Sequence, residues 1–431
     1  MTAIRPNLLK LAAPLAVFAA LLAVLALVNR SPSVPGRADV SGSSSSSARA
    51  RVDSLQQAIK AEPGNTEAYA ELGDAYLQRA RETADPSYYA RARRAFDAAL
   101  RRDPRSVTAT IGAGTLANLR HDFRWGLRLG RRARRLAPGL ARPDTVIADA
   151  QIELGRYAAA ERTLQRLVDL KPSLGSYARV SYFRELTGDQ PGAIEAMRLA
   201  ASAGGAPESV AYVRTLLGDL ELQRSVPAAR RAYREALAAV PSYPQAEAGL
   251  ARIQIARGRL DPAAARLRAV AAVLPTPTHL ILLAEADLAR GDRTAGRRDL
   301  AVVRAQQRLL RSAGAVPDAE TVLFEANHGD PRAGVRLGRR VWRSAPSIRS
   351  ADALGWALTR SGRPSEGLAW SERALSLGSR DPLFRFHAGA AAAVAGRPGA
   401  ARRDLRLALA GRAALPPGAT DRVRSLLERL R

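Results

Sequence analysis

Apolar residues recur along most of this 431-residue chain at spacings of three and four positions, which is the period of one face of an α-helix. The pattern begins with Leu55, Ala58 and Ile59 and is interrupted at Pro63. It then repeats as helix, short turn, helix and proline as far as Pro416, and a final apolar face lies near the C-terminus. These positions predict an all-α chain made of two-helix units with one extra helix at each end.

Prolines mark the ends of the predicted units at a regular period. Six of them follow one another at intervals of 34, 34, 35, 34 and 34 residues: Pro104, Pro138, Pro172, Pro207, Pro241 and Pro275. A single globular domain has no reason to keep such a period, whereas stacked helix pairs do. We therefore expect a repeat array over residues 51–416 and a C-terminal capping helix over residues 417–431.

Each unit also places particular residue types at fixed offsets. Small residues recur where two helices would cross closely, and large ones recur where they would interdigitate. The first unit carries Tyr69, Leu72, Gly73, Tyr76, Ala92, Phe96 and Pro104. This set resembles the tetratricopeptide repeat (TPR) family, whose helix-turn-helix pattern has these residue types at these offsets. The slightly longer RNA-binding pentatricopeptide pattern is the nearest alternative, but the spacing of the prolines and the Leu-Gly pair favour the first family.

The resemblance implies an α-solenoid of about ten helix pairs, wound as a right-handed superhelix whose first helices face a concave groove. Transferring the family's concave positions to the better-matched units selects polar residues that we expect in that groove: Asp74, Thr115, Asn118, Asp149, Glu153 and Arg252. The resemblance also implies protein or peptide partners there. Because lysine is nearly absent, the Lys and Asn cluster with which chaperone-binding members hold a peptide carboxylate has no counterpart.

Charge adds a second candidate surface. Sixty-seven Lys and Arg against 40 Asp and Glu give a net charge of +27, which predicts attraction to phosphate-rich polymers or anionic lipid head groups. A basic stripe on one helical face carries Arg124, Arg128, Arg131 and Arg135, and a smaller cluster repeats the theme at Arg332, Arg336, Arg339, Arg340 and Arg343. The stripe is either a solvated helix face or a site for anionic lipid or another polyanion, such as a cell-wall polymer. Nucleic acid is the least favoured of these partners.

The residue patterns that carry chemistry are missing from the sequence. There is no cysteine, so disulfides, thiolate metal sites and cysteine nucleophiles are excluded. The four histidines lie far apart, and no phosphate-binding loop or nucleophile elbow is present. We expect no catalytic residue, no metal site and no cofactor. The four tryptophans are expected to pack between helices: Trp125, Trp342, Trp356 and Trp370.

The N-terminal segment predicts attachment to a membrane. After a short tail of residues 1–7, residues 8–28 are apolar apart from Lys10, and a helix of this length can span a hydrocarbon core of about 30 Å. A cleaved signal peptide is the alternative, but the end of the apolar run lacks a small-residue cleavage pattern. Residues 29–50, rich in Ser, Pro and Gly, predict a disordered tether.

Together these features predict a bacterial, single-pass membrane protein whose repeat array lies outside the cytoplasm. Its expected function is not enzymatic. The array would serve as a scaffold for protein–protein interaction, in the assembly of an envelope or secretion complex. The alternative is a basic array that binds anionic lipid or another polyanion through its net charge.

Overall fold

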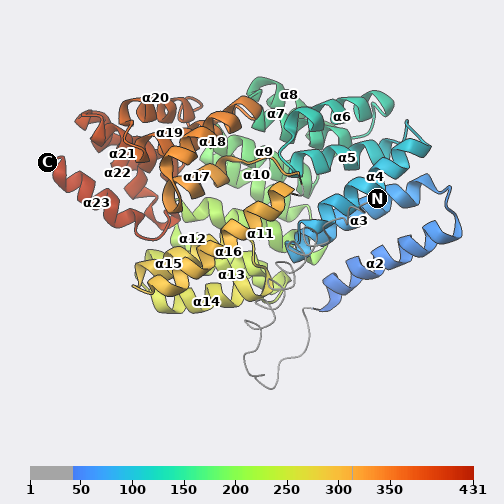
Figure 1. The fold of residues 1–431 in the computed structure, drawn as a ribbon, viewed down its shortest axis with the longest axis horizontal. Helices are drawn as coiled ribbons and strands as arrows, with labels where there is room; N and C mark the ends of the chain where they lie inside the picture. Colours follow the sequence, from blue (N-terminus) through green and yellow to red (C-terminus); the bar gives the residue numbers. More distant parts are fainter. Residues whose placement is uncertain (1–41, 313) are drawn as a thin grey trace, which may run out of the picture. The chain divides into compact units, whose positions relative to one another are not determined.

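The computed structural model describes residues 42–431 with the exception of residue 313, and residues 43–431 form one compact unit. All regular structure in these described residues is helical. The described chain begins with α2 (Gly42–Ala61), ends with α23 (Ala419–Arg429), and places ten helix pairs between them (Figure 1). The predicted fold class, an all-α solenoid of about ten two-helix units, is confirmed.

In each pair the first helix packs against the second, and the second packs closely against the first helix of the next pair, with α16 and α17 as the exception. The first five pairs are α3 (Thr66–Thr83) with α4 (Ser87–Arg102), α5 (Val107–Leu119) with α6 (Phe123–Leu136), α7 (Arg142–Glu153) with α8 (Tyr157–Leu170), α9 (Leu174–Leu186) with α10 (Gln190–Ser202), and α11 (Pro207–Leu222) with α12 (Val226–Ala239). The next five are α13 (Pro244–Ala256) with α14 (Leu260–Val273), α15 (Pro277–Ala289) with α16 (Arg293–Ser312), α17 (Ala319–His328) with α18 (Pro331–Ser344), α19 (Ile348–Arg360) with α20 (Pro364–Ala374), and α21 (Pro382–Val394) with α22 (Pro398–Ala410). A short 3-10 helix, η2 (Arg412–Ala414), precedes α23.

Local sequence explains where most helices start and where the first helix of a unit turns back. Side-chain oxygens of Ser, Thr, Asp or Asn accept a backbone N–H in the first turn of many helices, as Ser106 does for Ala109 and Asp189 does for Gly192. Proline occupies the first turn of others, where its missing N–H has no intrahelical partner to lose. Several units place a glycine with positive φ between their two helices: Gly155, Gly188, Gly258, Gly291, Gly362 and Gly396.

Glycines on the first helices of two successive units let both helices approach an aromatic side chain of the second helix that lies between them. A Cβ atom on Gly73 or on Gly112 would lie 2.4 or 2.2 Å from the Phe96 ring. The same arrangement recurs where Gly218 and Gly249 face Tyr233. The aromatic ring thus occupies the space that a larger residue at either glycine position would fill. The small and large residues that recur in the sequence pack against each other in this way.

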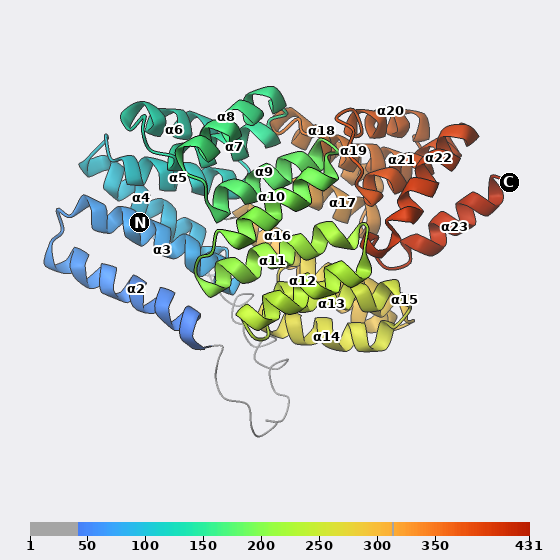
Figure 2. The same cartoon turned by 180° about the vertical axis from the view of Figure 1, so that it is seen from behind.

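Late helix pairs of the array contact earlier ones. The helices α18 and α19 lie beside α7, α8 and α9 in both views of the molecule (Figures 1 and 2). An apolar cluster joins these regions, with Ile152, Leu164 and Phe183 from the earlier helices and Ile348 and Phe384 from the later ones. We call the contacts between these sequence-distant regions the closure contacts.

Backbone groups make up much of the closure contacts. The Ile348 backbone N–H donates to the Tyr157 hydroxyl at 2.7 Å, and the Arg120 guanidinium donates to the carbonyl oxygen of Gly314 at 2.7 Å. A Cβ atom on Gly155 would lie 2.3 Å from the Pro346 carbonyl oxygen, and one on Gly188 would lie 2.1 Å from the Gly378 carbonyl oxygen. The short turns that follow two of the first helices therefore fit directly against linkers some two hundred residues later in the sequence.

Two sequence predictions need correction here. The predicted tether, residues 29–50, ends too late, since α2 already begins at Gly42 and includes the serine run. Serine has a middling helix propensity, so nothing in the run stops a helix that the packed residue Val52 and its neighbours stabilise. Trp125 is 44 % exposed, whereas the other three tryptophans pack into apolar clusters as predicted.

The predicted membrane anchor, residues 8–28, and the first part of the predicted tether lie outside the described residues. Among the helices of residues 42–431, none combines the length and the apolar character needed to cross a bilayer.

Candidate functional site

First helices of different units are linked by a series of charged or polar pairs, which we call the first-helix ladder; all but the pair of α3 and α7 join consecutive first helices. In each pair a carboxylate on an earlier first helix accepts from a side chain on a later one. Its members are Arg142 to Asp74, Arg179 to Asp149, Tyr182 to Glu153, Arg252 to Asp219, and Arg349 to Glu320. Arg179 is bidentate, with its Nε and Nη2 atoms 2.8 and 3.0 Å from the two Asp149 carboxylate oxygens. The ladder runs across the face that the sequence assigned to the groove.

Four of the six predicted groove residues are members of this ladder. Asp74 and Asp149 keep solvent-accessible side chains beside their arginine partners. Glu153 and Arg252 differ because closure contacts reach them: the Ser347 hydroxyl lies 3.4 Å from a Glu153 carboxylate oxygen, and Arg252 donates to the carbonyl oxygen of Ala414 at 3.3 Å. The groove is therefore partly occupied by the chain itself at these two positions.

The remaining two predicted groove residues hydrogen-bond backbone carbonyl groups. The Thr115 hydroxyl donates to the Ile111 carbonyl oxygen of its own helix, at 3.0 Å. Asn118 donates to the Val146 carbonyl oxygen at 3.0 Å, and its amide lies against Gly126 of the paired helix. The Asn118 prediction is corrected, because its side chain turns toward a backbone carbonyl of a neighbouring helix, whereas the hydrogen bond of Thr115 stays within its own helix.

The ladder was not foreseen from the sequence, although a signal for it exists. In sequence, Asp149 and Arg179 are 30 residues apart, and Glu320 and Arg349 are 29 residues apart. This spacing is slightly shorter than the 34-residue repeat, because the later residue lies about one helical turn earlier on its own helix. Searching the sequence for acids followed by Arg or Tyr at this offset would find several of these pairs.

Glu185 introduces an uncompensated acid next to the ladder. Its carboxylate accepts from the Gln223 amide at 2.8 Å, and Asp381 and Asp219 lie close enough to repel it. Burial, followed by the Asp381 charge, raises the pKa of Glu185 to about 7. The Asp381 carboxyl also has a raised pKa, with burial as the main cause. Because α9 carries Glu185 and Asp381 precedes α21, this acidic pair lies at the closure contacts.

We predict that Glu185→Gln stabilises the protein at pH 8 and has little effect at pH 4. Between pH 4.5 and about 7 the folded state keeps a proton that the unfolded state releases, so the free energy of unfolding falls as pH rises through this window. Glutamine removes that penalty, which corresponds to roughly 1–3 kcal/mol above pH 7. Urea unfolding of the wild type and the variant at the two pH values measures the difference in their free energies of unfolding. The same difference at both pH values would contradict the prediction.

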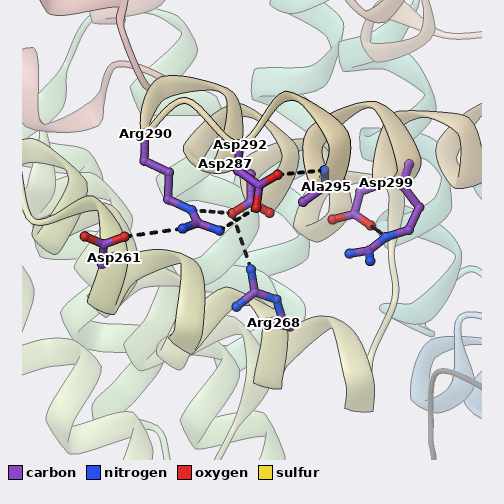
Figure 3. A network of polar contacts seen from close by, with 8 residues as sticks. Asp261, Arg268, Asp287, Arg290, Asp292, Ala295 and Asp299 are labelled. Carbon is purple, nitrogen blue, oxygen red and sulfur yellow. Dashed lines mark hydrogen bonds and ion pairs between the residues drawn. The ribbon is translucent and has the colours of Figure 1, made fainter.

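Several arginines outside the ladder hold neighbouring helices together. Figure 3 shows Asp287, whose side chain is 0 % exposed, between Arg268 of the preceding helix and Arg290 at the end of α15. The Arg290 Nε atom lies 2.8 Å from Asp287, and its Nη2 atom lies 2.9 Å from Asp292. Arginines also donate to backbone carbonyl oxygens of the prolines that end a unit, as Arg166 does to Pro138 at 2.6 Å. Many of the positive charges therefore have a structural partner.

The predicted basic stripe lies on an exposed face of α6. Its four arginines are solvent-exposed and form no ion pair within residues 48–431, in contrast to those in Figure 3. Arg128 lies over the exposed Trp125, with its guanidinium carbon 4.8 Å from the ring centroid. On the opposite face of α6, Leu127, Leu129 and Ala133 are buried. The stripe is thus the solvent side of an amphipathic helix.

A tetratricopeptide repeat profile matches residues 87–141, which cover α4, α5 and α6. This segment belongs to the tetratricopeptide repeat family. The described residues form ten helix pairs in one array, and the tetratricopeptide repeat fold is that of a scaffold for protein–protein interaction. No curated protein sequence matches the chain.

Solved structures are similar to the chain at low sequence identity. A human IFIT1 dimer with m7Gppp-AAAA is 17 % identical, covers 77 % of this chain and 77 % of its own, and gives a TM-score of 0.48. YrrB, described as a TPR protein with an unusual peptide-binding site, is 16 % identical, covers 45 % of this chain and 96 % of its own, and gives a TM-score of 0.29.

Proposed function

We propose that this tetratricopeptide repeat protein is a membrane-anchored scaffold that binds segments of partner proteins along the first-helix ladder. The observation that carries the proposal is the ladder itself. Arg142 and Arg179 are held in place by carboxylates yet remain accessible to solvent. Pre-positioned polar groups of this kind can bind a peptide without a large loss of side-chain entropy.

An exposed aromatic residue lies next to the open part of the ladder. Tyr212 on α11 is 48 % exposed, and the charges of Arg179, Asp149, Asp219 and Arg81 act on its hydroxyl group. Aromatic and arginine side chains are the residue types that dominate protein–protein contacts. We therefore place the binding of a partner segment around Tyr212 and Arg179.

The membrane anchor and the biological setting belong to the same proposal. The apolar run of residues 8–28 supports anchoring, and the array would lie outside the cytoplasm and serve in assembly of an envelope or secretion complex. The proposed role is non-enzymatic, since a ladder of paired charges offers contacts along a surface and no group that is aligned for proton or acyl transfer.

The proposal is tested by crosslinking in intact cells. A photo-crosslinking amino acid at position 212 of the full chain is expected to give defined protein adducts. Exchanging the charges with Asp149→Arg and Arg179→Asp keeps an ion pair but reverses its direction, and we expect it to reduce these adducts by tenfold or more. The helical content measured by circular dichroism should stay unchanged, because an exposed pair contributes only about 0–1 kcal/mol to stability.

Position 407 provides the matched control for this experiment. Leu407 on α22 is also 48 % exposed but belongs to a second helix. A crosslinker there should not give the adducts seen from position 212. Identical adducts from both positions, or adducts that the charge exchange leaves unchanged, would contradict binding along the ladder.

The basic face of α6 supports a second candidate function, binding of anionic lipid or another polyanion. Four exposed arginines on one helix, none with a carboxylate partner among the described residues, are the observation that favours it. This second function does not exclude the first, because the stripe and the ladder lie on different helices.

A further inference from the structure

A second helix repeats the arginine pattern of α6. Residues 124–138 and 332–346 share arginines at five equivalent positions, glycines at two, and a final Ala-Pro. The arginines of the second set lie on α18: Arg332, Arg336, Arg339, Arg340 and Arg343. All five are exposed, while Gly334, Val335, Leu337 and Val341 on the other face are buried. Two distant helices thus present the same basic face to solvent.

The closure contacts bring these two helices together. The Nη2 atom of Arg124, in the first turn of α6, donates to the backbone carbonyl oxygen of Arg343 in the last turn of α18, at 2.8 Å. A guanidinium at this position also interacts favourably with the negative end of the α18 dipole. The end of one basic face therefore adjoins the start of the other, although 219 residues separate the two.

These arginines are poorly neutralised compared with the rest of the molecule. Among the described side chains, carboxylates approach only Arg336, from Asp330 at 3.7 Å, and Arg339, from Glu366 at 3.7 Å. Both pairs are exposed to solvent, where screening leaves little attraction. The combined face of α6 and α18 therefore keeps most of its positive charge.

A shallow basic hollow lies at the far end of α6. Arg134, Arg135, Pro138 and Arg166 line it. Asp144, whose side chain is 0 % exposed, lies beneath and accepts from Arg134 at 3.3 Å and from Arg166 at 3.1 Å. The buried carboxylate fixes the two guanidinium groups, and Arg135 has no carboxylate partner in the described structure. Fixed guanidinium groups of this kind suit a phosphate group.

We propose that the combined basic face of α6 and α18 docks on an anionic lipid bilayer, with head-group phosphates in the hollow beside Arg135. Trp125 favours a bilayer over a nucleic acid, because a single exposed indole among arginines suits the head-group region. Binding of single-stranded nucleic acid relies instead on several aromatic side chains that stack on successive bases. The inference rests on the charge-based function proposed above and assigns it a location and a partner.

A proximity measurement on the full chain tests this docking. The chain has no native cysteine, so Gly139→Cys next to the hollow and Gly399→Cys on α22 each carry a single fluorescent donor. Neither position has an atom within 4 Å of an added Cβ. Vesicles of phosphatidylcholine, with or without phosphatidylglycerol, carry an acceptor on a lipid head group. We expect energy transfer from position 139 and much less from position 399, with a strong dependence on phosphatidylglycerol and on low salt.

Three charge-reversal variants locate the contact. Arg128→Glu, Arg131→Glu and Arg135→Glu alter α6, and Arg332→Glu, Arg336→Glu and Arg340→Glu alter α18. The matched control changes the same charge on exposed residues of α16: Arg297→Glu, Arg308→Glu and Arg311→Glu. We expect each of the first two to weaken vesicle docking by roughly tenfold or more, and the control to change it less than about twofold.

Each outcome separates this inference from the proposals before it. Docking of the wild type that depends on phosphatidylglycerol but is unchanged in both α6 and α18 variants would leave the charge-based function standing and overturn this location. No preference for phosphatidylglycerol would overturn the lipid docking, and if polyadenylate also did not bind, the charge-based function would fall with it. Binding of polyadenylate that is lost in the α6 and α18 variants, without vesicle docking, would assign the face to nucleic acid and overturn the lipid proposal. The crosslinking result at position 212 is independent of all three.

Discussion

Replacing Tyr233 with alanine is expected to lower the free energy of unfolding by about 3–5 kcal/mol, as found for buried aromatic residues in general. Tyr233 is 0 % exposed and lies between Gly218 and Gly249, which leave space for its ring. Its hydroxyl donates to Asp219 at 2.7 Å, so alanine also removes one partner of a ladder carboxylate. The cavity cannot close easily, because the helices on both sides are held by the neighbouring pairs.

Tyr212→Ala is the matched control for this change, since Tyr212 lies on the same unit but is 48 % exposed. We expect it to alter the free energy of unfolding by less than about 0.5 kcal/mol. Urea unfolding followed by circular dichroism compares the two variants. Hydrogen exchange should show the loss of protection concentrated in α11, α12 and α13, because each pair contacts mainly its neighbours. Equal destabilisation by both substitutions would show that the packing of Tyr233 is not the cause.

The helix pairs themselves were predictable because their signals are local. The prolines that end units, the glycines between helices and the three- and four-residue apolar spacing each act within about one turn of helix. The exposed face of the basic stripe follows from the same period: Arg124, Arg128, Arg131 and Arg135 lie opposite the buried Leu127 and Ala133.

The closure contacts were not predictable because they depend on small rotations between successive pairs. Each pair turns slightly relative to the last, and the sum over about ten pairs decides whether Gly155 meets Pro346 or lies far from it. Neither residue type indicates which distant residue it will contact. The same reason explains why the groove prediction failed in part at Glu153 and Arg252, which the later pairs reach.

Side-chain direction was the other source of error. Thr115 and Asn118 occupy positions that the helical period assigns to the groove, but each hydrogen-bonds a nearby backbone carbonyl. Short polar side chains commonly do so, and the choice depends on which carbonyl lies within reach. Trp125 illustrates the reverse case, since a large apolar residue lies on the exposed side among arginines whose aliphatic stems can cover it.

Opening the closure contacts is expected to produce the largest change in shape. Gly155 has φ of 67° and Gly188 has φ of 82°, so alanine at either position is strained to begin with. The added Cβ atoms would also lie 2.3 Å from the Pro346 carbonyl oxygen and 2.1 Å from the Gly378 carbonyl oxygen, and backbone atoms cannot move aside as a flexible side chain can. The double variant Gly155→Ala, Gly188→Ala should therefore separate α7, α8 and α9 from the later pairs.

Gly258 and Gly396 separate the clash from the backbone strain. They have φ of 72° and 70°, and an added Cβ atom at either position meets nothing within 4 Å. The control variant Gly258→Ala, Gly396→Ala therefore carries comparable strain without touching a closure contact. We expect the first double variant to lose about 1–3 kcal/mol more at each site than the control, the range for overpacking. Its radius of gyration from small-angle X-ray scattering should rise, while that of the control stays at the wild-type value.

The same pair of variants links the closure to the basic face. Because Arg124 contacts the end of α18 only in the closed arrangement, the double variant should also weaken docking on phosphatidylglycerol vesicles, with every arginine still present. A radius of gyration that rises without any loss of vesicle docking would show that α6 and α18 bind independently. An unchanged radius of gyration would show that the linkers near Pro346 and Gly378 give way instead, and that the apolar cluster around Ile152 and Ile348 is enough to hold the closed form.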